Sequence, residues 1–363
     1  MKKVLLGDII ELAYGKSLPQ RSRVSGRFPV FGSNGQVDTH NKYLVGGPGI
    51  IIGRKGSVGE VIWSKQDFWP IDTTYHVKLK NPDDDLRYWY YVLKTLGLNK
   101  LNSHSAIPGL NRDVAYIKQV PLRSTLEQKK IADILSSLDE KIELNRRMNE
   151  TLEQLGQALF RHYFVDNPEV DSWENGEVSD IVRVHSGFAF KSKDFDIDGR
   201  YGLVTIKNVQ DGSFIKDCTD HLSEPLPDKI PDHVHLKSGD IILSLTGNVG
   251  RVCIVVGRDY LLNQRVAKLA SAESQAYVYF LFRSKTMKDR MVGISKGTAQ
   301  KNLSPIETGK LKIKIPPTNI MSQFEENAMD LLNVIVSNNE QTQNLISLRD
   351  SLLPKLISGE IEI

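Results

Sequence analysis

Two long stretches of the chain carry the same helical pattern and superpose without a gap at a constant offset of 193 positions. The first set of apolar and polar seam positions is Ile131, Leu135, Leu138, Ile142, Asn145, Leu152, Leu155 and Leu159. The second is Phe324, Ala328, Leu331, Ile335, Asn338, Leu345, Leu348 and Leu352. Their spacings mostly alternate between three and four, which is typical of a coiled-coil seam. Each helix would have about 38 residues and a length of about 57 Å.

A single helix of that length overhangs an ordinary domain, so we expect the two helices to pair with each other. The alternative, in which each helix packs on its own domain, stays open at this point. In a chain that doubles back, the pairing would be antiparallel and the helix midpoints, near Asn145 and Asn338, would meet. Buried polar seam residues can fix the register at some cost in stability, and we expect this role for the two asparagines. Met148 and Gln341 occupy the seven-residue gap that follows each asparagine.

The ends of both helices carry stop or cap signals. Thr125 followed by Gln128 is a weak capping signal for the first helix, and Asn167-Pro168 ends it. Ser358-Gly359 ends the second helix.

The segments that precede the two helices are also repeated. Each contains a glycine-rich hairpin (49–59 and 239–250), an aromatic helical stretch (86–98 and 277–291) and a closing run that ends in proline (116–121 and 311–316). The alternation in the closing runs predicts half-buried strands. We therefore expect an α+β protein, in which two mixed α/β domains are joined by an antiparallel coiled coil with internal pseudo-two-fold duplication. The expected division is 1–123, first domain; 124–166, central helix; 167–317, second domain; and 318–363, distal helix.

Composition and charge restrict the class of protein. The chain is 40% hydrophobic and 25% charged, which is typical of a globular protein, and no apolar run reaches the ~20 residues of a membrane helix. The N-terminus does not resemble a signal peptide, and two cysteines, Cys218 and Cys253, fit unpaired thiols in a reducing cytoplasm. Residues 1–123 carry 18 basic and 10 acidic side chains, whereas residues 318–363 carry 2 and 7. This asymmetry predicts a polyanionic partner for the first domain.

The region from Pro121 through Thr125-Leu126-Glu127-Gln128-Lys129-Lys130-Ile131 to Ile142 resembles the central conserved helix of type I restriction-modification specificity subunits. The segment Ser351-Leu352-Leu353-Pro354-Lys355-Leu356-Ile357-Ser358-Gly359-Glu360-Ile361 resembles the C-terminal ending of that family. The second copy departs from the pattern, because Gln323-Phe324-Glu325-Glu326 lacks the usual basic residues after the glutamine.

This resemblance implies a DNA specificity subunit with no active site of its own. Each target-recognition domain would read one half of a bipartite double-stranded DNA target, and the paired helices would set the unread gap. Two methyltransferase subunits would dock along the helices to methylate adenine, and restriction (translocase) subunits would join for cleavage. S-adenosylmethionine, ATP and Mg²⁺ would belong to those partners, and this chain would bind no cofactor.

Direct readout of DNA requires side chains that form paired hydrogen bonds with base edges, together with basic groups for phosphates. In the first domain the candidates are Lys16, Ser17, Arg54, Lys55, Ser57, Ser105, Asn111 and Arg112. In the second they are Thr246, Asn248, Arg251, Asn263, Gln264, Arg265, Lys296, Thr298, Gln300, Lys301 and Asn302. Glycine-rich turns with a few charges are more often solvated hairpins, so the sets carry more weight than any one member.

Several enzyme motifs are weak. Gly293-Ile294-Ser295-Lys296-Gly297 matches a serine-hydrolase elbow, but it follows a helical pattern where that motif needs a strand–turn–helix. Gly15-Lys16-Ser17 has Ile10 where a phosphate loop needs glycine, and His233 with His235 lacks a third metal ligand. Two alternatives remain: a hydrolase that uses Ser295, and a coiled-coil scaffold that binds proteins through its globular ends.

Overall fold

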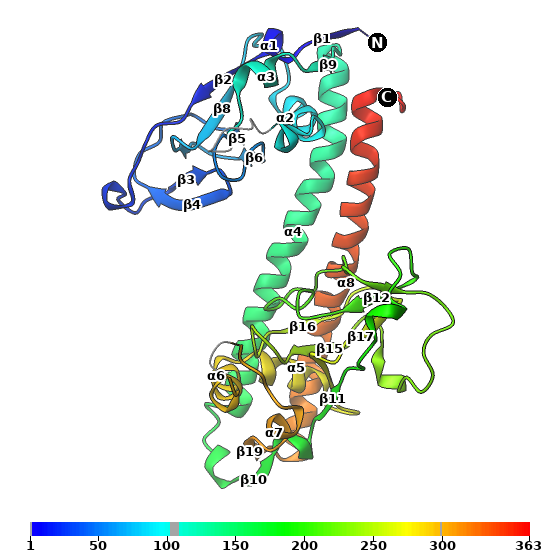
Figure 1. Cartoon of the computed structure of the whole chain (residues 1–363). Coiled ribbons are helices and arrows are strands. Elements are labelled where there is room, and N and C mark those ends of the chain that lie inside the picture. Colours follow the sequence, from blue (N-terminus) through cyan, green and yellow to red (C-terminus); the bar gives the residue numbers. More distant parts are fainter. Residues whose placement is uncertain (1, 102–108, 298–299) are drawn as a thin grey trace. The chain divides into compact units, whose positions relative to one another are not determined.

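The computed structural model describes residues 2–101, 109–297 and 300–363 of the chain. The chain forms two compact units: unit 1 is Met1–Lys141 with Leu345–Ile363, and unit 2 is Ile142–Asn344. Two long helices, α4 (Thr125–Phe164, 40 residues) and α8 (Thr318–Ser358, 41 residues), each contribute one part to each unit (Figure 1). Both expected helices are therefore present, and the α+β class is confirmed.

The described residues of unit 1 form three sheets. The main sheet is antiparallel, in the order β2 (Ile10–Tyr14), β8 (Thr74–Leu79), β5 (Gly49–Gly53) and β6 (Val61–Ser64). A smaller sheet has the order β4 (Gly35–His40), β3 (Phe28–Gly32) and β7 (Trp69–Pro70), and β1 (Lys3–Leu5) pairs with β9 (Gln119–Pro121). The helices are α1 (Leu6–Ile9), α2 (Leu86–Thr95) and α3 (Arg112–Tyr116), with short 3-10 turns at Gln20–Ser22 and Leu98–Lys100.

Unit 2 repeats this topology. Its main sheet has the order β11 (Arg183–Ser186), β18 (Val266–Ala270), β15 (Ile241–Ser244) and β16 (Val252–Ile254). The second sheet has the order β13 (His221–Leu222), β12 (Tyr201–Val204), β17 (Tyr260–Leu262) and β14 (His235–Leu236), and β10 (Glu174–Glu177) pairs with β19 (Lys312–Ile315). The helices are α5 (Gln275–Arg283), α6 (Lys285–Ile294) and α7 (Pro305–Gly309), with 3-10 turns at Val170–Ser172, Val178–Asp180, Ser192–Asp194 and Asp232–Val234. The strand order of the main sheet is the same in both units, which confirms the expected duplication.

Some helix and strand boundaries differ from those that the sequence pattern predicts, and side-chain caps explain the difference. The second aromatic stretch is two helices, because the Ser284 side chain caps α6 by accepting from the Met287 amide. The closing run of unit 1 is a strand only over Gln119–Pro121. Its first residue, Tyr116, is instead the last residue of α3, which Asn111 caps by accepting from the Asp113 amide.

The N-terminal cap of α4 is formed by the residues that precede the expected pair Thr125 and Gln128. Ser124 and Glu127 form a capping box, in which the Ser124 amide donates to Glu127 and the Glu127 amide donates to the Ser124 hydroxyl. Gln128 is fully buried and accepts from the Asp85 amide at 2.8 Å, beside α2. The sequence signal therefore marks the correct helix end, but one residue too late.

The two helices run antiparallel within each unit. In unit 2, Asn145 of α4 contacts Asn338, Gln341 and Thr342, whereas Asn149, one turn later, contacts Ile335 and Asn339. Later residues of α4 thus contact earlier residues of α8, so the two helices are antiparallel here. In unit 1, Asp139 accepts from Arg349, and Arg123, which precedes α4, donates to the Leu356 carbonyl. This is the expected pairing.

The asparagines lie in a polar layer of the helix pair. Asn145 is fully buried, and its amide nitrogen donates to Gln341 at 2.8 Å and to the Asn338 carbonyl at 3.4 Å. Asn338 donates to the side chain of Asn149 at 2.9 Å. The Asn145 amide oxygen is buried and has no hydrogen-bond partner among the described residues, which is costly in a protein interior. The layer therefore defines the register at the expense of stability.

Replacing both Asn145 and Asn338 by leucine should raise the melting temperature of the full chain by about 2–4 °C, the shift that about 1 kcal/mol gives in a domain of this size. The gain comes from removing an unpartnered buried oxygen. Gln341 loses its bond to Asn145 at little cost, because Gln341 is exposed and can bond to water instead. Differential scanning calorimetry measures it. Asn327→Leu, at an exposed position of α8, is the matched control and should stay within about 0.5 kcal/mol. An unchanged melting temperature in the double variant would contradict this account.

Some seam positions differ from the sequence pattern. Leu135 and Ile335 are buried, and Leu138, Ile142, Leu152, Leu345 and Leu352 are half-buried. Leu155 and Leu348, by contrast, are 48% and 47% exposed, and Leu332 is buried where Leu331 was expected. Met148 is exposed as well, and Asn149, the next residue, contacts the partner helix instead. The seam shifts because side chains of unit 2 also pack on α4, so that the buried face follows Leu152, Gly156 and Phe160.

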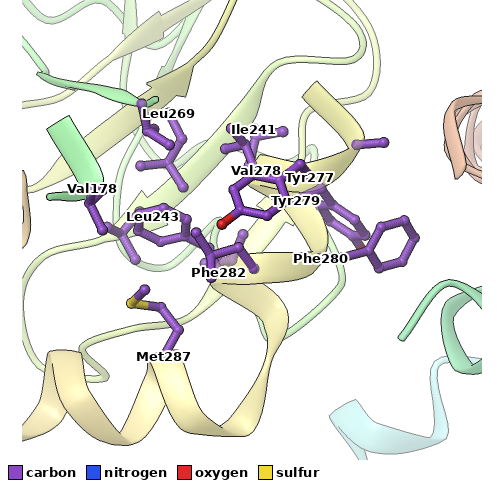
Figure 2. Packing of buried hydrophobic residues seen from close by; sticks show 14 of the residues in the cluster. Val178, Ile241, Leu243, Leu269, Tyr277, Val278, Tyr279, Phe280, Phe282 and Met287 are labelled. Atoms are coloured by element: carbon purple, nitrogen blue, oxygen red, sulfur yellow. The ribbon is translucent and has the colours of Figure 1, made fainter. Parts of the chain in front are cut away.

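Aromatic side chains of α5 form much of the unit 2 core. Figure 2 shows Phe280 on the opposite side of α5 from Leu243 and Leu269, which belong to the main sheet. The Phe280 ring contacts α4 at Gly156, where a Cβ atom would lie 2.1 Å from its Cζ. Only glycine fits this close approach. The helix α5 therefore joins the sheet to α4 within unit 2.

Candidate nucleic-acid interface

The predicted contact residues of unit 1 meet at one end of its main sheet. Strands β2 and β5 end there while β8 and β6 begin, with Tyr14 opposite Tyr75 and Gly53 opposite Thr74. We call residues 15–17, 54–60 and 109–112 the unit 1 loop end. It brings together Lys16, Ser17, Arg54, Lys55, Ser57, Asn111 and Arg112. Ser105 lies outside the described residues.

Two arginines of the unit 1 loop end share one aromatic ring. Arg54 has its Cζ 5.3 Å from the ring centroid of Tyr14, and Arg112 has its Cζ 4.6 Å from the same centroid. Beneath them, the buried Tyr75 hydroxyl donates to the Leu110 carbonyl at 3.1 Å, and burial raises the pKa of Tyr75 to about 12. Tyr75 therefore stays neutral and ties strand β8 to the loop that carries Arg112.

The other candidates of unit 1 have distinct surroundings. Lys16, Ser17, Lys55 and Ser57 are exposed, and Lys55 forms a β-bridge with Gly109. Asn111 uses its side-chain oxygen to cap α3, so it has a structural role in this arrangement. The exposed lysines suit phosphate contacts, for which charge matters more than geometry.

The unit 2 loop end is built in the same way. Strands β11 and β15 end where β18 and β16 begin, with Ser186 opposite Ala267 and Ser244 opposite Val266. Residues 187–191, 245–251, 263–265, 296–297 and 300–302 form this loop end. It gathers the candidates Thr246, Asn248, Arg251, Asn263, Gln264, Arg265, Lys296, Gln300, Lys301 and Asn302. Thr298 lies outside the described residues.

Several candidates of unit 2 hold its loops together. Thr246 is buried, and its hydroxyl donates to Asn302 at 2.9 Å, while Asn302 and Lys296 form a β-bridge. Arg251 donates to Gln210 at 2.6 Å and lies beside the Asn248 side chain. Gln264, Arg265, Gln300 and Lys301 are exposed and have the donors and acceptors that base edges require.

The same tight turn lies at both loop ends. Residues Gly56-Ser57-Val58-Gly59 match Gly247-Asn248-Val249-Gly250, and all four glycines have positive φ between 71° and 81°. The valines are buried, and the polar residue before each valine is exposed. The duplication thus places Ser57 and Asn248 at equivalent exposed positions, which the sequence pattern had singled out.

Half-buried acidic residues of the long helices hold the helices α2 and α5 in place. In unit 1, Asp139 of α4 accepts from Tyr91 at 2.6 Å, Arg87 at 3.2 Å and Arg349 at 2.9 Å. In unit 2, Glu325 of α8 accepts from the Ala276 and Tyr277 amides at the start of α5, and Glu153 of α4 accepts from Tyr279 and Arg283. Sequence reasoning missed these contacts, because their acidic residues look like ordinary surface charges of a helix.

The enzyme motifs do not form sites in the described residues. Ser295 follows the last residue of α6, and its hydroxyl donates to the Val292 carbonyl, so there is no strand–turn–helix elbow. His233 bonds to the Ser186 carbonyl and stacks on His185, and His235 lies in β14. No cluster of three or more His, Cys, Asp or Glu in residues 2–101, 109–297 and 300–363 is placed to hold a metal ion. Over the same ranges, no helix has both the length and the apolar character that crossing a membrane requires.

Known proteins resemble this chain over most of its length. The family described as type I restriction modification DNA specificity domain matches residues 1–154 and 170–346. The MjaIX specificity subunit of a type I restriction enzyme from Methanocaldococcus jannaschii is 27% identical and aligns over 86% of this chain and 78% of its own length. The MjaVIII specificity subunit of the same organism is 24% identical and aligns over 99% of this chain and 92% of its own length. The crystal structure of a type I restriction-modification S subunit from M. genitalium covers 98% of this chain and 96% of its own, with a TM-score of 0.67 at 18% identity, which shows the shared fold.

The chain has a duplicated domain, two equivalent loop ends and a long pair of helices. These features define a two-domain recognition protein. The chain belongs to the type I restriction-modification DNA specificity family. It is a specificity subunit with two target-recognition domains, and recognition of DNA, not catalysis, is its part in the system.

Proposed function

We propose that each loop end reads one half of a bipartite double-stranded DNA target. In this proposal residues 1–123 and 167–317 are the two recognition domains, and residues 124–166 and 318–363 are the helices that set the unread gap. The observation that carries it is the repeated sheet end, which gathers ten of the candidate side chains in unit 2 and seven in unit 1. A duplicated reader matches the pseudo-two-fold symmetry of duplex DNA.

Other subunits supply the chemistry in this proposal. Two methyltransferase subunits dock along the helices, and restriction subunits join them for cleavage in the cytoplasm. S-adenosylmethionine, ATP and Mg²⁺ are bound by these partners. An exposed apolar face on the unit 2 part of α4 supports docking: Leu144, Met148 and Leu155 are 38–50% exposed and recur at helical spacing.

Selection from random duplex DNA tests this function. The chain is supplied with its methyltransferase partner at moderate salt, and the recovered DNA is sequenced. We expect a split motif with a fixed unread gap, and an affinity that falls steeply with salt, because residues 1–123 have a net charge of +8. A contiguous motif would mean that only one domain reads DNA. No enrichment from the folded complex would instead favour a protein-binding scaffold.

A further inference from the structure

Two arginines of unit 1, Arg54 and Arg112, lie over the ring of Tyr14. Arg23, Arg87 and Arg123 each form an ion pair, with Asp38, Asp139 and Glu127 respectively. Among the described residues, neither Arg54 nor Arg112 has a carboxylate within ion-pair distance. Two cations therefore share a ring without a protein anion, an arrangement that an electronegative ligand would stabilise.

Among the described residues, the Arg54 guanidinium is bonded along one edge. Its Nε and Nη2 donate to the Asp72 carbonyl at 3.1 and 2.6 Å, and its Cζ lies 5.3 Å from the centroid of the Tyr14 ring. A guanidinium has five N–H donors in a planar fork. No described residue accepts a hydrogen bond from the other edge, where Nη1 and the second hydrogen of Nη2 offer two parallel donors. This is the geometry that matches the O6 and N7 acceptors of guanine in the major groove.

The equivalent positions of unit 2 lack this arrangement. Register and turn alignment place Ser186 where unit 1 has Tyr14, and Leu245 where it has Arg54. Ser186 and Leu245 provide neither an aromatic ring nor a guanidinium, and the exposed Gln264 and Gln300 of the unit 2 loop end carry amides. The two loop ends therefore share a frame but differ in the chemistry that they offer to a base.

We propose that Arg54 is a specificity-determining residue that reads a guanine in the half-site of unit 1. Tyr14 and the Asp72 carbonyl are its positioning groups. This assignment rests on the proposed function, since it names the base that one recognition domain reads. A residue that is stacked and bonded along one edge has little freedom, which suits base discrimination better than a contact to a phosphate.

The test uses Arg54→Lys, which keeps the charge but removes the two-donor edge. The full chain with its methyltransferase partner is assayed against the selected target and against the same target with each base pair replaced in turn, at fixed salt. We expect Arg54→Lys to reduce discrimination for one G·C pair in one half-site by about 10- to 100-fold. All other positions, and the whole other half-site, should stay unchanged.

Variants of the positioning residue separate readout from folding. Tyr14 is 52% exposed, so its replacement leaves the core intact. Tyr14→Phe keeps the ring and should retain wild-type discrimination, whereas Tyr14→Leu should weaken it at the same G·C pair. Arg21→Lys, an exposed arginine of unit 1 away from this ring, is the matched control and should change no base preference.

Three results would overturn the assignment. A uniform loss of affinity for every sequence, with a smaller salt slope, would make Arg54 a phosphate contact. A split motif whose preferences Arg54→Lys leaves unchanged would remove Arg54 from readout while the proposed function stands. The absence of any split motif with the wild-type complex would overturn the proposed function itself, and the guanine assignment with it.

Discussion

Replacing Gly156 by alanine should destabilise unit 2 by about 2–3 kcal/mol, the cost of overpacking a rigid core. The added Cβ would lie 2.1 Å from Cζ and 2.2 Å from Cε1 of Phe280, whose ring is fully buried. In most helix interiors the same substitution stabilises the protein by about 0.5–1 kcal/mol. The sign of the change in unfolding free energy therefore shows whether Phe280 packs closely on Gly156. Urea unfolding of the full chain, with hydrogen exchange of the α5 amides to locate the effect, measures it.

The chain offers a matched control for this substitution. Gly293 also lies in a helix, α6, and a Cβ built there meets no atom within 4 Å. Gly293→Ala should therefore be neutral or stabilising. Adding Phe280→Leu to the Gly156→Ala variant should restore part of the lost stability, because the smaller side chain leaves room for the methyl group. A Gly156→Ala variant as stable as the wild type would contradict the close packing of α5 on α4.

Removing one matched heptad from each helix should shorten the unread gap by about three base pairs. Seven residues of helix correspond to about 10 Å, or roughly a third of the ~34 Å of one DNA turn. Residues 145–151 of α4 and 335–341 of α8 are suitable, because Asn145 contacts Gln341 and Asn149 contacts Ile335 across the pair. The deletion leaves in place Asp139, Glu153 and Glu325, which bond to residues of α2 and α5. Selection from random DNA would then report the new gap directly.

Single deletions are the control for this experiment. Deleting residues 145–151 alone leaves one helix longer than its partner and puts the seam out of register, so we expect a lower melting temperature and no defined new gap. With both deletions, the two half-site sequences should be retained, since neither loop end is altered. Altered half-sites with an unchanged gap would show that the helices do not measure the distance between them.

The sequence was informative wherever a property repeats along the chain. The duplication, the two long helices and their antiparallel asparagines follow from periodicity and a constant offset, and the glycine turns follow from the conformations that only glycine adopts easily. The candidate loops could also be predicted, because polar residues between strands cluster where the strands end. Their assembly into one loop end per unit required only the strand order.

Contacts between distant segments could not be predicted from the sequence. Leu155 fits the seam by spacing, yet it is exposed, because Phe280 from another part of the chain packs against Gly156 and determines which face of α4 is buried. The helix cap made by Asn111 and the bond between Thr246 and Asn302 could likewise not be predicted from the sequence.

The two similar domains and the two long helices with one seam pattern could be predicted from the sequence, because local periodicity and internal repetition are properties of the chain alone. Which arginine keeps unused donors among the described residues depends on the tertiary structure. Arg54 is held by Asp72 and lies over Tyr14, and these three residues come from separate segments. The donors left free on a side chain depend on every neighbour that folding brings to it, and for Arg54 those neighbours lie 18 and 40 positions away along the chain.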